Sequence, residues 1–141
     1  MSEKIEVHFS GKIAQKAILV KGDKVLLVRD PREAEEIWEI PGGRMNKGEE
    51  PRTGLGRELM EELGVSCDIH EVIHLEQFFQ KNEGSEAFVI VYRATLLDEN
   101  APFTFEDREV CEHKWVGKGE WETLKLFPEY KRALETYFNT L

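Results

Sequence analysis

Runs and alternations of apolar residues along the chain predict strands interleaved with helices. Two apolar runs, at 14–20 and 25–28, flank Lys21-Gly22-Asp23-Lys24, and a Gly-Asp pair between such runs indicates a tight β-hairpin. Segment 32–36 shows neither the alternation of a strand nor the spacing of a helix, and is expected to be an exposed loop or a short helical turn. Further strands are expected at 5–9, 37–40, 67–80, 87–97 and 109–116.

Helical spacing occurs in two places. Leu55, Leu59 and Leu63 form one apolar stripe between Pro51, which suits a first helical position, and Gly64, which suits a left-handed cap. A second helix is expected after Pro128, where apolar residues recur at helical spacing up to position 141. Its stripe is typical of core packing, and we assign it no functional role.

Length and composition narrow the class of protein. The 141 residues predict one domain spanning 1–141, and the apolar runs are too short for a transmembrane helix. A net charge of -9 argues against a surface for duplex DNA or RNA, which needs clustered Lys and Arg. Only Cys67 and Cys111 are present, no secretory leader is evident, and a reduced cytoplasmic location is expected.

Glu58, Glu61 and Glu62 stand at positions i, i+3 and i+4 of the first predicted helix. They share one face, where like charges repel by roughly 0.2–0.5 kcal/mol per pair. The last two also lie near the negative end of the helix dipole, and Gly54 and Gly56 weaken the helix by about 1 kcal/mol each. A stretch that breaks several local preferences is expected to be functional, and a bound cation would reconcile these features.

The same stretch runs Gly43, five residues, Glu49, seven residues, then Arg57 through Val65 as RELMEELGV. This pattern resembles the signature of the Nudix hydrolases at every defined position, and segments 38–43 and 114–116 resemble those of MutT-like members. The resemblance implies an α/β fold, namely an α/β/α sandwich around a mixed β-sheet. It also implies a loop-helix-loop motif that holds divalent cations and hydrolysis of a nucleoside diphosphate linked to another group.

The resemblance also implies roles for the motif residues. Glu58, Glu61 and Glu62 are the expected metal ligands, together with the carbonyl of Gly43; Glu58 and Glu61 also count as catalytic. Oxygen ligands suit Mg²⁺, and Mn²⁺ is a plausible substitute.

Three further motif positions are expected to support the site. Arg57, which also counts as catalytic, lies four residues before Glu61 and can hold that carboxylate in its ligating rotamer. Glu49 can brace the loop or join the outer metal shell, and Gly64 ends the helix. A solvated surface ion pair is the alternative for Arg57 and Glu49. Where many members carry Ala-Ala, this chain has Gly54-Leu55-Gly56, and we hypothesise that Gly54 enlarges the metal pocket.

A general base from outside the helix is expected at Glu109, six residues before Trp115, where MutT-like members place a downstream Glu. Glu106 and Glu112 compete for this role, and an ordinary surface glutamate is the plain alternative.

Candidates for substrate binding are aromatic and basic. Trp38, Phe78 and Phe79 can stack on a base, although strand aromatics are more often core residues. Arg29 and Arg32 can contact phosphate, with a surface ion pair as the alternative.

These features favour a MutT-like nucleotide pyrophosphatase. ADP-ribose, nucleotide sugars and dinucleoside polyphosphates are alternative substrates, although Gln80 stands where ADP-ribose-specific members often carry Pro. Removal of pyrophosphate from RNA 5′ ends is disfavoured by the acidity, and a non-catalytic nucleotide sensor is the alternative from another class. The sequence does not decide between a monomer and a homodimer, a state common in the family.

Overall fold

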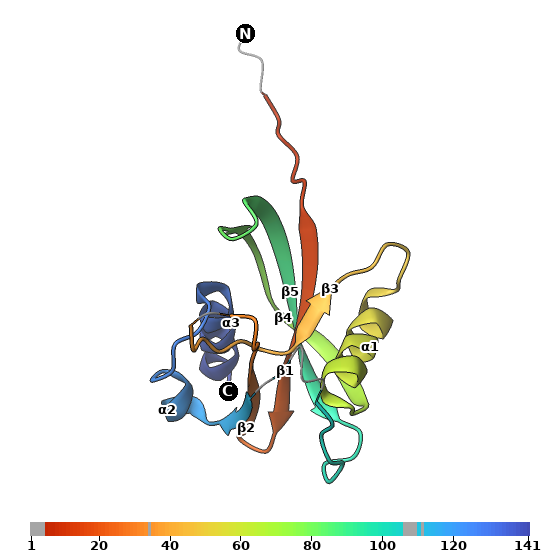
Figure 1. Ribbon diagram of the computed structural model, residues 1–141, viewed down its shortest axis with the longest axis vertical. Helices are drawn as coiled ribbons and strands as arrows, with labels where there is room; N and C mark the ends of the chain where they lie inside the picture. Colours follow the sequence, from red (N-terminus) through yellow and green to blue (C-terminus); the bar gives the residue numbers. More distant parts are fainter. Residues whose placement is uncertain (1–4, 34, 106–109, 111) are drawn as a thin grey trace.

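A computed structural model of the chain describes residues 5–33, 35–105, 110 and 112–141. In the described part, six strands form one mixed sheet with the order β4-β5-β1-β2-β6, and β3 pairs with β1 off this path (Figure 1). The strands are β1 (Lys12–Lys21), β2 (Lys24–Arg29), β3 (Gly42–Arg44), β4 (Cys67–Gln80), β5 (Ser85–Leu96) and β6 (Glu112–Val116). The helices are α1 (Pro51–Leu63), α2 (Lys118–Trp121) and α3 (Pro128–Asn139). None of these helices is long and apolar enough to cross a membrane.

The β1–β2 hairpin is formed as predicted. Lys21 pairs with Lys24, so the turn consists of Gly22 and Asp23, and Gly22 has a positive φ of 61°. β1 then runs parallel to β5, from Lys12 opposite Ala87 to Val20 opposite Thr95, while its contacts with β2 and β3 are antiparallel. The mixed sheet implied by the sequence is therefore confirmed.

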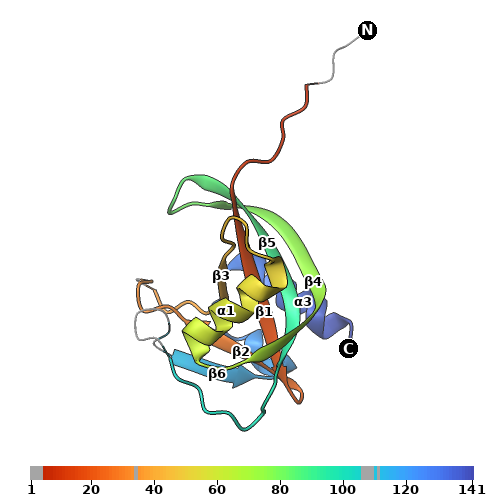
Figure 2. The same ribbon diagram turned by 90° about the vertical axis from the view of Figure 1, so that its right-hand side faces the viewer.

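Helices α1 and α3 cover opposite faces of the sheet (Figures 1 and 2), and a separate hydrophobic core lies under each. Successive residues of β1 alternate between them: Ile18 belongs to the core under α3, whereas Ala17 and Leu19 belong to the core under α1. This double coverage explains why β1 is an almost continuous buried run instead of an alternating one. The arrangement is the α/β/α sandwich expected from the sequence.

Helix α1 begins and ends where the sequence predicts. The Glu50 carboxylate accepts hydrogen bonds from the backbone N–H groups of Arg52 and Thr53, which caps the helix start beside Pro51. Gly64 adopts the left-handed conformation with φ 69° and donates to the carbonyl of Met60. Its stripe of Leu55, Leu59 and Leu63 is buried, which fixes the rotation of the helix and turns the glutamates away from the core.

Several predicted elements differ from the structure. Segment 5–9 forms no strand: Ile5 and Val7 are exposed, and the segment extends away from the sheet (Figure 1). Segment 37–40 contributes only isolated bridges, Trp38 to Leu126 and Glu39 to Val28. Alternation in a short segment does not make a strand without a neighbouring edge to pair with.

Elsewhere the differences are smaller. β5 begins at Ser85, two residues before the predicted start, and α2 was not predicted because one helical turn leaves little periodicity. β6 confirms the last predicted strand over Glu112–Val116, while residues 109 and 111 lie outside the described residues.

Candidate active site

Glu58 and Glu62 approach β3 at two glycines. Glu62 Oε2 accepts a hydrogen bond from the Gly42 backbone N–H at 3.2 Å. A Cβ atom added at Gly43 would lie 2.4 Å from Glu58 Oε2, so a larger residue there would displace this carboxylate from the backbone. Gly42 has φ 145°, and a Cβ there would lie 2.1 Å from the carbonyl oxygen of Gln15. The glycine pair thus allows the acidic face of α1 to pack against the sheet edge.

Arg57 gathers three carboxylates at the same place. Its Nε and Nη2 donate to the two oxygens of Glu49 at 2.7 and 3.0 Å, a bidentate pair. Its Nη1 donates to Glu61 at 3.0 Å and its Nη2 to Glu58 at 3.1 Å. These hydrogen bonds, first those to Glu49 and Glu61, raise the pKa of Arg57, and the same contact lowers the pKa of Glu49. The expected Arg57–Glu61 contact is present, and we name Arg57, Glu49, Glu58 and Glu61 the Arg57 cluster.

Gly54 explains how Glu49 reaches Arg57. A Cβ at Gly54 would lie 2.6 Å from Glu49 Oε1, so the Glu49 side chain fills the space that a larger residue would occupy. Glu49 therefore occupies the room beside Gly54, and the enlarged metal pocket that we hypothesised from the sequence stays a hypothesis.

The donor atoms around α1 fit a hard divalent cation. Glu58, Glu61 and Glu62 supply carboxylate oxygens, and Gly43 lies against Glu58. Within the described ranges, no three His, Cys, Asp or Glu side chains are grouped so as to hold an ion as they stand, since the carboxylates face Arg57 and the Gly42 N–H. Oxygen-only ligands match the preference of Mg²⁺ and Mn²⁺. A cation would compete with Arg57 for these oxygens.

The other predicted site residues lie in different surroundings. Glu109 and Glu106 fall outside the described residues. Glu112 lies on β6 opposite Arg29 and accepts hydrogen bonds from its Nε and Nη2 at 3.1 and 3.0 Å. Arg32 donates to both oxygens of Asp30. Both arginines thus hold nearby carboxylates, and their predicted phosphate contacts stay predictions.

The aromatic candidates separate into buried and exposed residues. Trp38 is buried in the core under α3, and Phe78 packs against the same core. Phe79 is exposed on β4. The structure does not bring Trp38 and Phe79 together at the Arg57 cluster, and stacking on a base stays a prediction for each.

A buried lysine on β1 was missed from the sequence. Lys16 Nζ lies 3.1 Å from Glu39 Oε1 and 5.3 Å from the centre of the Tyr130 ring. Burial alone would lower the pKa of Lys16, but the charges of Glu39, Tyr130 and Glu62 outweigh burial and raise it. A lysine inside an apolar run was the available signal. We name Lys16, Glu39 and Tyr130 the Lys16 cluster.

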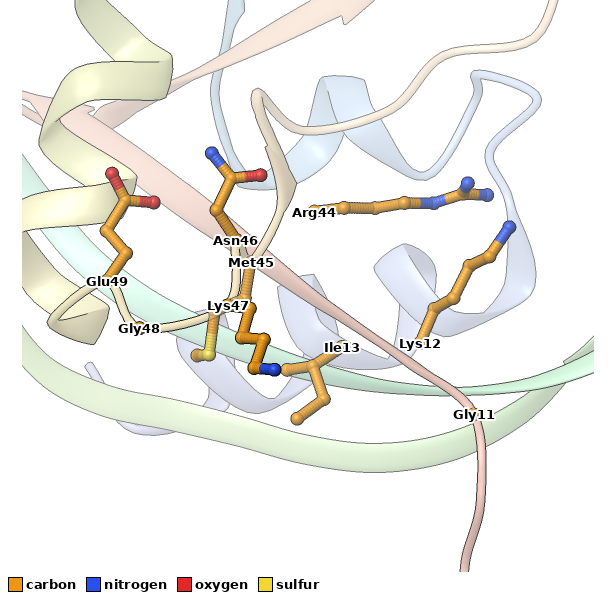
Figure 3. Close-up of a pocket in the computed structure, with 9 residues that line it drawn as sticks. All are labelled: Gly11, Lys12, Ile13, Arg44, Met45, Asn46, Lys47, Gly48 and Glu49. Carbon is orange, nitrogen blue, oxygen red and sulfur yellow. The ribbon is translucent and has the colours of Figure 1, made fainter.

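A pocket beside the Arg57 cluster was also missed. It has a volume of about 480 Å³ and lies between the start of β1 and the loop that leads from β3 to α1 (Figure 3). Its lining residues are Gly11, Lys12, Ile13, Arg44, Met45, Asn46, Lys47, Gly48 and Glu49. Because these residues come from two separate segments, their sequence spacing carried no signal. We call it the basic pocket.

Comparison with known proteins gives a family match over most of the chain. A family model described as the NUDIX domain matches residues 12–137. A CTP pyrophosphohydrolase of Escherichia coli (strain K12) is 35% identical over 63 residues, which cover 43% of this chain and 47% of that protein. Nudix hydrolase 7 of Arabidopsis thaliana is 28% identical over 106 residues, covering 70% of this chain and 36% of that protein. The matches thus span less than half the length of these curated relatives.

Solved structures share the fold at low sequence identity. A MutT NUDIX hydrolase from Burkholderia pseudomallei superposes with a TM-score of 0.77 at 20% identity, covering 91% of this chain and 98% of that chain. The E. coli ORF135 protein superposes with a TM-score of 0.76 at 23% identity, covering 91% of this chain and 89% of that chain. These likenesses support the sandwich described above.

Proposed function

Because the chain belongs to the Nudix family, as the match of its domain model to residues 12–137 shows, we propose that it is a divalent-metal-dependent pyrophosphohydrolase. Its reaction would cleave a phosphoanhydride bond in a nucleoside diphosphate joined to another group. One observation carries the proposal: the carboxylates of α1 meet the Gly42-Gly43 backbone, where Gly42 has φ 145° and donates its N–H to Glu62.

Glu58, Glu61 and Glu62 would hold the cation, with the Gly43 carbonyl as a further ligand. A bound Mg²⁺ or Mn²⁺ would neutralise phosphate charge and lower the pKa of the attacking water. The water oxygen forms a bond to phosphorus, the anhydride P–O bond breaks, and its electron pair leaves with the departing phosphate. The water proton passes to a carboxylate, for which Glu109 stays our candidate on sequence grounds.

Arg57 and Glu49 act on the geometry of the site in this proposal. Arg57 holds Glu61 and Glu58 through separate nitrogens, and the bidentate contact with Glu49 fixes the guanidinium plane. The Gly42 N–H donates to one oxygen of Glu62 and so fixes the position of that carboxylate. These contacts already restrict the ligand side chains to few rotamers. Metal binding would therefore cost less side-chain entropy.

We propose a free nucleotide, most specifically a nucleoside triphosphate, as the substrate. The E. coli relative is named for CTP, and a relative from Mycobacterium tuberculosis (strain ATCC 25618 / H37Rv), 45% identical over 49 residues that cover 33% of this chain, is named a putative 8-oxo-dGTP diphosphatase. The net charge of -9 also disfavours long nucleic acids as substrates. Mg²⁺ is the proposed cofactor, and we further propose a cytoplasmic location, in keeping with the free thiol of Cys67.

The test is a hydrolysis panel with Mg²⁺ or EDTA over nucleoside triphosphates, ADP-ribose, nucleotide sugars and dinucleoside polyphosphates. Activity is expected to require the metal and to favour triphosphates. Glu61→Gln is expected to lower turnover by at least about 10²-fold, the scale of a lost acid-base or ligand group. Glu135→Gln, on the exposed side of α3, is the matched control and should keep normal turnover. Metal-dependent nucleotide binding without turnover would contradict the proposal and indicate a sensor.

A further inference from the structure

We propose that Gln15, on β1, is a positioning residue of the proposed cation site: its side-chain carbonyl accepts a hydrogen bond from a water molecule that the cation carries. The inference rests on the proposed function and deepens it, because it adds a neutral acceptor to the acids of α1. Gln15 lies outside the segments that carry the family resemblance, at 38–43, 43–65 and 114–116. Its role therefore follows from its surroundings in the fold.

The side chain of Gln15 is a buried polar group within an apolar strand. It is 2% exposed, and its Oε1 atom accepts no hydrogen bond from any residue that the structure describes. Its neighbours on the same face of β1, Ala17 and Leu19, are buried and apolar. A buried acceptor without a partner destabilises a fold, and native proteins contain few such groups. An apolar side chain would be more stable here, so the amide indicates a partner that is not part of the chain.

The register of the sheet places Gln15 beside Glu58. Odd-numbered residues of β1 face α1, since Ala17 and Leu19 belong to the core under that helix. Gln15 therefore faces α1, and it pairs directly with Gly43 of β3. The open side of Gly43 faces α1 as well, because a Cβ there would lie between 2.4 and 2.8 Å from the carboxyl atoms of Glu58. Side chains of opposed residues start about 4.5–5.5 Å apart, and Gly43 adds none, so the amide of Gln15 can reach the Glu58 carboxylate.

Ionised carboxylates cannot satisfy this amide oxygen, because they are acceptors only. The carboxylates of Glu58 and Glu61 accept hydrogen bonds from Arg57. Oε1 of Gln15 is one more acceptor on the same face, and it needs a donor. A water molecule has two protons to donate, so it can donate one to a carboxylate and the other to the amide oxygen.

The water of a hydrated cation fits this place. Mg²⁺ usually keeps several waters when one or two carboxylates bind it. A neutral acceptor orients such a water without adding a negative charge to a helix face where Glu58, Glu61 and Glu62 already repel one another. Gln15 would thus raise the affinity for the cation through its water and leave the charge of the site unchanged.

Gln80 offers a matched comparison, because its Oε1 is likewise buried without a partner in the described part of the chain. Gln80 ends β4 at the turn toward β5, and this turn lies away from α1 (Figures 1 and 2). Gln15→Leu and Gln80→Leu are the same chemical change, made beside the proposed cation site and far from it. Leucine is close to glutamine in size and has no polar side-chain atom, so both variants remove an unsatisfied acceptor.

The binding experiment needs no turnover. Mn²⁺ is titrated into the nucleotide-free protein, and the free ion is followed by its electron paramagnetic resonance signal in wild type, Gln15→Leu and Gln80→Leu. Gln15→Leu is expected to bind Mn²⁺ about tenfold more weakly, the effect of one lost hydrogen bond. Gln80→Leu should bind as wild type does. Equal affinity of Gln15→Leu and wild type, or no binding to wild type, would overturn the inference.

Melting curves separate a role at the cation from an ordinary structural role. In EDTA, Gln15→Leu and Gln80→Leu should both melt at or above the temperature of wild type, because each loses an unpartnered buried acceptor. Mg²⁺ should then raise the melting temperature of wild type and of Gln80→Leu more than that of Gln15→Leu. A lower melting temperature of Gln15→Leu in EDTA would mean that the amide forms its hydrogen bonds within the chain, and would refute the proposed role.

Kinetics distinguish a failure of this inference from a failure of the proposed function. Gln15→Leu should need about tenfold more Mg²⁺ than wild type for half-maximal turnover, in line with its weaker metal binding. An unchanged Mg²⁺ requirement would contradict the role of Gln15 and leave the proposed function standing. If wild type hydrolyses no member of the panel, the proposed function fails, while the Mn²⁺ titration still decides whether Gln15 acts at a cation site.

Discussion

Two cationic side chains of this protein each form ion pairs with glutamates, one near the surface and the other in the interior. Arg57, on α1, is 32% exposed in its side chain and holds Glu49, Glu58 and Glu61. Lys16, on β1, is 10% exposed and holds Glu39 beside the Tyr130 ring. The Arg57 pairs are therefore more accessible to water than the Lys16 pair, most of all at Glu61, whose side chain is 54% exposed.

The difference indicates which cluster can change partners. The Arg57–Glu61 pair is exposed on the Glu61 side and is screened by water, so a metal ion can take this carboxylate from Arg57 at small cost. A buried pair loses its solvation on folding, and removal of one partner leaves an uncompensated charge in the interior. The Arg57 cluster thus suits a reaction centre that exchanges ligands, whereas the Lys16 cluster suits a fixed element of the fold.

The largest effect is expected from Lys16→Met. This change leaves the half-buried Glu39 without its cation and should lower the free energy of unfolding by up to about 3–5 kcal/mol, the range for a broken buried pair. The double variant Lys16→Met/Glu39→Gln removes both charges and should recover much of that loss. Urea unfolding measures both values. A single variant within about 1 kcal/mol of wild type would show that the pair is hydrated and that the comparison is wrong.

The Lys16 cluster also shows which kind of contact could not be predicted from the sequence. Helix α1 was predictable because its caps, Pro51 and Gly64, and its leucine stripe are local signals. The pairing of Lys16 with Glu39 joins residues 23 positions apart, and only the crossing of β1 with the segment after β2 brings them together. No periodicity marks such a contact.

The same limit applies to the errors elsewhere. Segment 5–9 alternates like a strand, yet it extends from the sheet and its apolar side chains are exposed.

The motif positions of Glu58, Glu61 and Glu62 were predictable from spacing on one helix. The basic pocket was not, because Lys12 lies 32 residues before Arg44 in the chain and β1–β3 pairing brings them together.

A pH-dependent effect is expected at Tyr130. Burial raises the pKa of Tyr130 from 10.0 to about 12. Because the folded state holds this proton more tightly than the unfolded state, its contribution to stability is complete below pH 10 and is lost as pH rises toward 12. Melting temperatures of wild type should therefore fall more steeply between these pH values than those of Tyr130→Phe. Parallel curves would show that the hydroxyl is not buried beside Lys16.

A smaller effect on stability is expected from Arg57→Gln. Despite its contacts with three carboxylates, the half-exposed cluster should lose little stability in EDTA, seen as a small fall in melting temperature, because water screens its charges. Arg132→Gln, which breaks an exposed pair with Glu76 on the other side of the sheet, is the matched control and should cost a similar amount. If Arg57→Gln alone lost as much stability as Lys16→Met, the two clusters would not differ in their contribution to the fold.

The smallest effect comes from two glycines of α1 that differ only in their neighbours. A Cβ at Gly56 would meet no described atom within 4 Å beyond its chain neighbours and the helix backbone, so Gly56→Ala should stabilise the helix by about 1 kcal/mol. At Gly54 the Cβ would lie 2.6 Å from Glu49 Oε1 and push that carboxylate from Arg57. Gly54→Ala should therefore gain a few tenths of a kcal/mol less than Gly56→Ala. Gly54→Ala should also lower turnover, because Arg57 loses the contact that orients it. Equal stability and equal turnover in the two variants would mean that Glu49 has no part in placing Arg57.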